Sequence, residues 1–178
     1  MKTVAAINYN AGNLRSLGWA LERVGASVDF ITSPDRIDNY EHIILPGVGS
    51  FGHGMTQLRS LGFVDPLRKI FLQGEKRLLG ICLGMQLFFN SSEESPGING
   101  LGFIKENIVR LDNLNSRLPH IGWNDLRELG VWPDMLSPIP VGTDFYFVHS
   151  YGYIGDCEYR HTVTDRPGQS FVSSVEFE

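Results

Sequence analysis

The chain has 178 residues, of which 42% are hydrophobic and 20% are charged, and its formal net charge is −5 at pH 7. This composition is typical of one soluble globular domain and argues against disorder, and no apolar run approaches the roughly 20 residues that a bilayer requires. We therefore expect no membrane span and no membrane partner. Because no basic stripe with interleaved aromatic residues occurs, we expect no nucleic-acid partner either. Two cysteines in unlike contexts exclude a disulfide scaffold and favour a reducing, cytoplasmic location.

Strand-like and helix-like segments alternate in the first half of the chain. Apolar runs predict strands at residues 3–8, 28–32, 42–45 and 77–82. Helical spacing predicts a helix capped by Asn13 and further helices around residues 54–61, 64–73 and 84–90. Continuous apolar strands that alternate with helices are typical of a parallel sheet covered on both faces.

The second half changes character after a loop at residues 91–100, which we expect to be solvated. Its strand-like stretches alternate between polar and apolar residues, as antiparallel strands do, at residues 103–110, 144–149, 161–164 and 171–177. The sequence thus predicts an α/β fold with a mostly parallel central sheet, helices on both faces and an antiparallel extension. We expect a single domain over residues 1–178.

The most informative segment is a G-x-C-x-G pattern, formed by Gly80, Cys82 and Gly84, that links a strand to a helix. It is the cysteine counterpart of the nucleophile elbow, a turn so tight that only small residues fit beside the nucleophile. Such a turn strains the backbone of the nucleophile and exposes its side chain above the sheet. The following helix favours a thiolate, and the Leu83 N–H points to where an oxyanion would form. A buried structural cysteine is the alternative interpretation.

A glycine-rich turn follows the strand at residues 42–45. Loops after parallel strands meet at one edge of the sheet, so this turn and Cys82 should lie close together. The backbone of Gly47, Val48 and Gly49 offers a second N–H to an oxyanion, or a cradle for a phosphate. Because the turn lacks the Lys-Ser/Thr ending of a P-loop, a nucleotide site is disfavoured, and a plain turn is the other interpretation.

Five stretches together resemble the class I glutamine amidotransferases, and within them the glutaminase subunits of imidazole glycerol phosphate synthase from histidine biosynthesis. They are residues 10–16 (NAGNLRS), 45–52 (LPGVGSFG), 80–86 (GICLGMQ), 119–124 (PHIGWN) and 146–151 (YFVHSY). The elbow alone would indicate only the wider class. The resemblance implies a flavodoxin-like fold, a heterodimer with a (β/α)8-barrel cyclase, and neither a cofactor nor a metal. Glutamine would be hydrolysed to glutamate, and the ammonia would pass to the cyclase.

The resemblance also implies roles for individual residues. Cys82 would be the nucleophile that attacks the glutamine side-chain amide. The oxyanion hole would be formed by Gly47, Val48, Gly49 and Leu83. The glutamine pocket would be lined by Gly49, Gln86, Ser150 and Tyr151. The side that docks the cyclase would carry Asn13, Trp123 and Tyr146.

The same chemistry needs a base for the thiol and an acid for the leaving amine, and the family supplies both from a His-x-Glu pair on a late strand. No such pair occurs in the 178 residues. Because the chain stops at Glu178 inside an alternating strand pattern, we expect a C-terminally shortened member that also lacks the final helix. A catalytically inactive, partner-binding subunit is one alternative. A paralogous subunit for bacterial surface-sugar synthesis is another.

A third alternative is a cysteine hydrolase on a related scaffold that uses His149 as its base. The resemblance places His149 in the pocket wall instead, and His120 in the segment that faces the cyclase. We expect His161, on an alternating strand, to be exposed, and His53 to cap the helix after the glycine turn. Cys157 has acidic neighbours, which favour an inert thiol.

Overall fold

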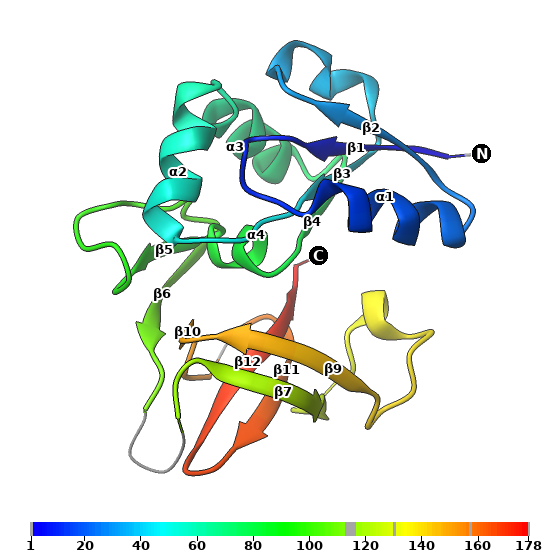
Figure 1. Ribbon diagram of the computed structural model, residues 1–178. Helices are drawn as coiled ribbons and strands as arrows, with labels where there is room; N and C mark the ends of the chain where they lie inside the picture. Colours follow the sequence, from blue (N-terminus) through cyan, green and yellow to red (C-terminus); the bar gives the residue numbers. More distant parts are fainter. Residues whose placement is uncertain (1, 113–116, 130, 157, 178) are drawn as a thin grey trace. The chain divides into compact units, whose positions relative to one another are not determined.

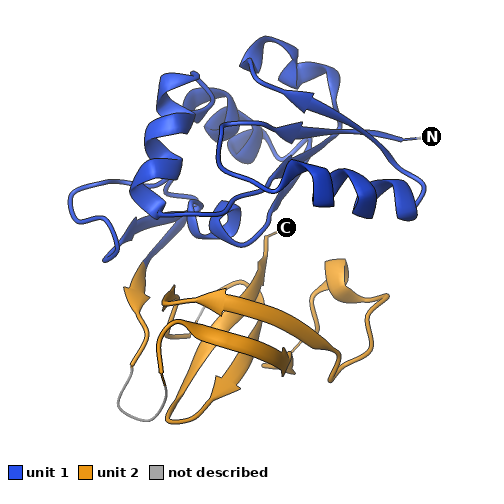
Figure 2. Cartoon of the chain, in the orientation of Figure 1, with its two compact units in different colours: residues 1–107 blue, residues 108–178 orange. Residues whose placement is uncertain are grey.

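The computed structural model describes residues 2–112, 117–129, 131–156 and 158–177. The chain divides into two compact units, Met1–Asn107 and Ile108–Glu178 (Figure 2). Strand β6 (Ile104–Arg110) runs from the first unit into the second. A single amidotransferase domain over residues 1–178 stays a prediction. No helix in the described part of the chain is long and apolar enough to cross a membrane.

Unit 1 is built on a four-stranded parallel sheet in the order β2-β1-β3-β4 (Figure 1). Its strands are β1 (Thr3–Ile7), β2 (Ser27–Ile31), β3 (His42–Leu45) and β4 (Arg77–Gly80). The connections carry α1 (Leu14–Arg23), the 3-10 helix η1 (Pro34–Asn39), α2 (Phe51–Ser60) and α3 (Val64–Gln73). Figure 1 shows α1 on one side of the sheet and α2 and α3 on the other, as right-handed crossovers in opposite directions require. The predicted parallel sheet with helices on both faces is confirmed.

The packing of α1 follows from its sequence pattern. Asn13 caps the helix by accepting a hydrogen bond from the Ser16 N–H at 3.2 Å, as predicted. Leu17 and Leu21 then fall on one face and pack against the small cluster formed by Val4, Ala6 and Ile44 of the sheet. This apolar contact holds the end of β1, and the loop after it, in place.

The segment after β4 differs from the prediction. The strand ends at Gly80, and a helix follows as predicted, but α4 (Leu83–Gln86) has only four residues, so the predicted length, to residue 90, is wrong. The end of the predicted helix belongs to strand β5 (Phe89–Ser92) instead. The reason is tertiary hydrogen bonding: the Leu101 N–H donates to the Leu87 carbonyl at 2.8 Å, where an α-helix would need an internal donor.

Unit 2 is built from antiparallel strands, as predicted for the second half. Its elements are β7 (His120–Asp125), β8 (Arg127–Glu128), the 3-10 helix η2 (Asp134–Leu136), β9 (Asp144–His149), β10 (Tyr151–Gly152), β11 (Arg160–Arg166) and β12 (Gln169–Glu176). β11 lies between β12 and β8, β7 pairs with β9, and β10 pairs with β6. Strand β7 was not predicted, because its apolar residues point outward.

Candidate active site

Three loops at the carboxyl edge of the parallel sheet bring the predicted site residues of unit 1 together. They follow β1, β3 and β4, which are neighbours in the sheet. The chain leaves β1 toward β2 in one direction and leaves β3 toward β4 in the other. The edge between β1 and β3 is therefore a topological switch point, where open α/β sheets bind ligands. The predicted proximity of the glycine turn to the cysteine elbow is confirmed by the contacts of Gly47 with Leu83 and Gly84.

The backbone at Cys82 is left-handed, with φ 54° and ψ −114°. A residue other than glycine held in such a region costs about 1–3 kcal/mol. The flanks of the turn have no room for side chains: a Cβ on Gly80 would lie 2.7 Å from the Met85 nitrogen, and one on Gly84 would overlap the Leu45 carbonyl oxygen. The strained elbow and its need for small flanking residues are confirmed.

Hydrogen bonds hold this elbow against β3. The Ile81 N–H donates to the Leu45 carbonyl at 3.0 Å, and the Gly84 N–H donates to the Ile81 carbonyl at 2.9 Å. Cys82 is exposed as a residue. Protein atoms nevertheless surround its thiol, and this partial burial raises the pKa of the thiol, while a hydrogen bond from the Leu83 backbone N–H opposes the rise. The thiol is thus mostly protonated at neutral pH and needs a base before it can attack.

The glycine turn approaches the elbow through Gly47. A Cβ on Gly47 would lie 2.8 Å from Leu83 Cβ, so only glycine allows so close an approach. Gly49 has φ 105°, which also favours glycine. The Val48 N–H donates to the Ala11 carbonyl at 3.3 Å, so in this structure it is bonded within the protein and is not free for an oxyanion.

Tyr9 adjoins the site and was not predicted from the sequence. It lies in the loop after β1, and only 1% of it is exposed. Its hydroxyl reaches Gly47, where an added Cβ would collide with it. Among the described residues this hydroxyl has no hydrogen-bond partner. Its position after a strand, on the same sheet edge as Cys82, is the one signal in the sequence that would have indicated it.

The loop at residues 93–95 supports the helix that follows the glycine turn. The Glu94 carboxylate, expected to be solvated, accepts a hydrogen bond from the Phe51 N–H at 2.7 Å. Ser50, and not His53 as expected, is the N-cap, and its hydroxyl accepts from the His53 N–H at 3.4 Å. Serine is a preferred N-cap because its short side chain reaches the free N–H groups of the first turn.

The residues predicted to bind glutamine are divided between the units. Gly49 and Gln86 lie in unit 1, whereas Ser150 and Tyr151 lie in unit 2. The Ser150 carbonyl accepts a hydrogen bond from the Leu111 N–H at 3.0 Å, which fixes the backbone there. Tyr151 begins β10. The assembly of these four residues into one pocket stays a prediction.

Two histidines of unit 2, His149 and His161, have defined tautomers. His149 Nδ1 lies 2.9 Å from the Tyr151 carbonyl and must donate to it, which leaves Nε2 buried and, among the described residues, without a partner. His161 bonds the Tyr159 carbonyl in the same way. The expected exposure of His161 is wrong, because only 4% of it is exposed on β11, the central strand of its sheet. Cys157 lies outside the described residues.

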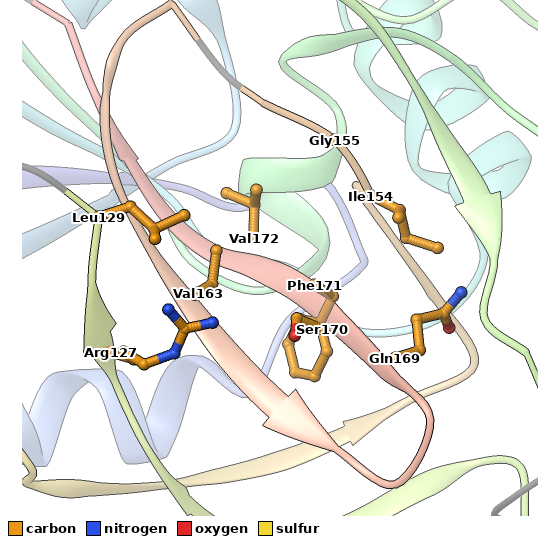
Figure 3. Close-up of a pocket in the computed structure, with 9 residues that line it drawn as sticks. All are labelled: Arg127, Leu129, Ile154, Gly155, Val163, Gln169, Ser170, Phe171 and Val172. Carbon is orange, nitrogen blue, oxygen red and sulfur yellow. The ribbon is translucent and has the colours of Figure 1, made fainter.

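A cavity of about 320 Å³ lies within unit 2. Figure 3 shows the residues that line it, which come from β8 and the residue after it, from the segment before β11, and from β11 and β12. It is mainly apolar, and its one cationic side chain, Arg127, is held by Asp165 in a two-pronged ion pair of 2.9 and 3.0 Å. None of the nine residues around this cavity is among those predicted for glutamine binding or catalysis.

Two of the three residues predicted to face the cyclase, Trp123 and Tyr146, lie on an exposed surface of unit 2. In the register of β7 and β9, Trp123 lies opposite Tyr146 and Ile121 opposite Val148. All four point outward, with exposed fractions of 68%, 55%, 60% and 55%. The Trp123 and Tyr146 rings lie 5.5 Å apart. We call these four residues the apolar strand pair. Asn13, in unit 1, is engaged as the cap of α1.

Comparison with known proteins agrees with this geometry. The family model described as "Glutamine amidotransferase class-I" matches residues 5–154. Imidazole glycerol phosphate synthase subunit HisH 1 of Campylobacter jejuni (strain RM1221) is 40% identical over 175 residues, which cover 97% of this chain and 86% of that protein. Imidazole glycerol phosphate synthase hisHF of Emericella nidulans is 42% identical over 154 residues, which cover 85% of this chain and 28% of that protein.

A solved structure of the same fold is that of PurLQS from Thermotoga maritima, with a TM-score of 0.65 and 21% identity over 98% of this chain and 76% of that one. The chain belongs to the class I glutamine amidotransferases, in the family of the HisH subunits of imidazole glycerol phosphate synthase. The predicted glutaminase function in histidine biosynthesis is thus supported over the surface-sugar alternative.

Proposed function

We propose that Cys82 is the nucleophile with which this subunit hydrolyses glutamine, and that the ammonia passes to a cyclase subunit of (β/α)8-barrel fold. The observation that carries the proposal is the strained backbone at Cys82, with φ 54°, beside a glycine turn at the switch point of the sheet. Strain of this kind persists only where surrounding contacts enforce it, and it concentrates at active sites.

The chemistry is acyl transfer through a thioester. The Cys82 thiolate adds to the side-chain carbonyl carbon of glutamine and produces a tetrahedral oxyanion. The C–N bond then breaks, and the leaving amine takes up a proton and departs as ammonia. Water adds to the thioester, the C–S bond breaks, and glutamate leaves as the thiol is restored. Gly49, Gln86, Ser150 and Tyr151 would hold the glutamine during these steps.

Stabilisation of the oxyanion would come from backbone N–H groups near the thiol. The Leu83 N–H already interacts with the Cys82 thiol and is the first candidate donor. The second would come from the turn of Gly47, Val48 and Gly49. Because the Val48 N–H is bonded to the Ala11 carbonyl, this hydrogen bond must break, or a neighbouring N–H must serve, before the turn can contribute.

Extension of the chain tests whether a His-x-Glu pair supplies the base for the Cys82 thiol. We expect a protein extended by a C-terminal segment that carries a His-x-Glu pair to release glutamate from glutamine when the cyclase is present. Cys82→Ala should abolish this activity, and Cys157→Ala, the matched control, should retain it. If Cys82→Ala stayed active, the nucleophile assignment would be wrong.

The cyclase would dock on the apolar strand pair. An antiparallel ribbon that turns two aromatic and two aliphatic side chains outward, in cross-strand register, exposes an apolar patch typical of interaction sites. The match to part of the longer Emericella nidulans hisHF protein supports a partner that works in permanent association with this subunit. Trp123, the most exposed of the four, would be the central contact.

Calorimetric titration with the cyclase tests this surface. We expect Trp123→Ala to weaken binding about 30-fold, which corresponds to about 2 kcal/mol for an aromatic hot spot. Leu72→Ala is the control, since Leu72 is an exposed apolar residue on α3 of unit 1 and is not part of the strand pair. Equal dissociation constants for the Trp123→Ala variant and the unmodified chain would refute the placement.

A further inference from the structure

The Tyr9 hydroxyl is a buried polar group whose hydrogen-bonding capacity is unused within the part of the chain that the structure describes. A buried hydroxyl without a partner is destabilising, and native proteins rarely retain one without a reason. Elsewhere in unit 1, Tyr40 follows the rule: its hydroxyl donates to Asp29 at 2.6 Å and accepts from Arg36 at 2.9 Å. We therefore expect the Tyr9 hydroxyl to form a hydrogen bond with a ligand or with a charged group during function.

The atoms near the Tyr9 hydroxyl belong to the glycine turn and to the elbow. The loop after β1 places the hydroxyl against Gly47, so that any side chain at Gly47 would collide with it. The other atoms that such a side chain would meet are Leu83 Cβ at 2.8 Å and the Gly84 nitrogen at 3.0 Å. The hydroxyl thus points into the space where the glycine turn meets the elbow. Leu83 is the residue that directly follows Cys82.

We propose that Tyr9 is a positioning residue whose hydroxyl donates toward the Cys82 thiolate and stabilises it. The inference rests on Cys82 being the nucleophile. A neutral thiol is a weak acceptor, and a thiolate is a strong one, so the hydroxyl gains its partner when the thiol loses its proton. This explains why the Tyr9 hydroxyl is unused while the Cys82 thiol is protonated.

The acidity of Tyr9 suits this donor role. Burial raises the pKa of the Tyr9 hydroxyl, and the negative charge of the nearby Cys82 thiolate raises it further. Tyr9 therefore keeps its proton at neutral pH, and its neutral hydroxyl can act as a hydrogen-bond donor. Its contribution opposes the desolvation that raises the pKa of the Cys82 thiol.

The test is the pH profile of Cys82 alkylation by iodoacetamide in the full 178-residue chain, with the two cysteines resolved by peptide mass spectrometry. We expect Tyr9→Phe to shift the profile toward higher pH and to slow alkylation at pH 7.5 about threefold to tenfold. The melting temperature of Tyr9→Phe should hold or rise by about 2–4 °C, since the variant removes an unpaired buried hydroxyl.

Tyr40→Phe is the matched control. It removes a hydroxyl from the same unit, and we expect it to lower the melting temperature and to leave the alkylation profile unchanged. A Tyr9→Phe profile that coincides with that of the unmodified chain would overturn the proposal, whether or not the melting temperature fell. The assay contains no glutamine, so an inactive chain extension would count against the proposed function and not against this inference.

Discussion

His149 is held as a neutral imidazole by its surroundings. Burial lowers the pKa of His149, and the neighbouring His120 and Arg166 lower it further, although the hydrogen bond to the Tyr151 carbonyl partly opposes them. The rings of His120 and His149 lie 5.3 Å apart, and Phe171 packs edge-on against His149 at 4.5 Å. A protonated His149 would therefore be an unfavourable charge among aromatic rings.

This environment predicts a loss of stability in mild acid. In the unfolded chain His149 takes up a proton near pH 6.5, whereas in the folded chain it does so only at lower pH. Below pH 6.5 the unfolded state thus binds more protons, and the free energy of unfolding falls as pH falls toward the folded pKa. We expect a loss of up to about 1 kcal/mol between pH 7.5 and 5.5, measured by urea unfolding.

His149→Gln supplies the comparison, because glutamine does not titrate. Its free energy of unfolding should be lower at pH 7.5 but should change less between pH 7.5 and 5.5. Parallel curves for the two proteins would show that other groups carry the acid sensitivity.

At the scale of residues, the sequence predicted the site residues that belong to local sequence patterns. Cys82 and its two glycines form a continuous pattern whose geometry follows from a tight turn alone. Tyr9 was missed because its importance comes from contacts with loops about 40 and 70 positions away. The exposure of His161 was also wrong, because alternation in a strand does not show that the strand is central in its sheet.

At the scale of elements, the elbow depends on close contact between α4 and the end of β3. A Cβ on Gly84 would overlap the Leu45 carbonyl oxygen, and backbone of this kind cannot move aside as a flexible side chain can. We expect Gly84→Ala to destabilise unit 1 by on the order of 1–3 kcal/mol, or to prevent folding, because the clash forces backbone shifts. Urea unfolding would measure the loss.

Gly18→Ala is the matched control for this prediction. Gly18 lies within α1, and an added Cβ would make ordinary contacts of 3.6 Å with the Phe30 ring. Alanine in a helix interior is favoured over glycine by about 1 kcal/mol, so this variant should be as stable as the unmodified chain or more so. Equal effects of the two substitutions would mean that the elbow tolerates a side chain.

The sequence did not predict elements whose residue pattern or length depends on contacts with other parts of the chain. Strand β7 has His120 buried and Ile121 and Trp123 exposed, which inverts the usual alternation of a half-buried strand. The same inversion is what indicates an interaction surface. Helix α4 ends early because residues from 100 onward supply its hydrogen bonds, and no local rule describes that competition.

At the scale of the whole molecule, the order of strand and helix patterns along the chain predicted the fold class but not the division into two compact units. That division follows the change from parallel to antiparallel strands, and β6 bridges it. The change of strand pattern predicted after residues 91–100 therefore anticipated the change from parallel to antiparallel strands, but not the boundary between the units at residues 107 and 108.

Partner binding should raise the stability of the whole chain. A cyclase that binds only the folded subunit stabilises it by mass action, by about 2.7 kcal/mol at a concentration 100 times the dissociation constant. We expect differential scanning calorimetry to show a higher melting temperature for the subunit in the mixture. Tyr146→Ala should reduce the rise, and Val131→Ala, an exposed apolar control outside β7 and β9, should keep it. A melting temperature unaffected by the cyclase would contradict the heterodimer.

The left-handed backbone of Cys82 has a practical consequence for trapping complexes. Replacement of Cys82 by alanine removes the thiol but keeps a Cβ, and with it the strain of φ 54°. Glycine removes both, because it adopts positive φ at little cost. Cys82→Gly should therefore melt at a higher temperature than Cys82→Ala while being equally inert, and equal melting temperatures would show that the strain is relieved elsewhere. The Cys82→Gly variant should therefore be the more stable protein for crystallising a complex with glutamine.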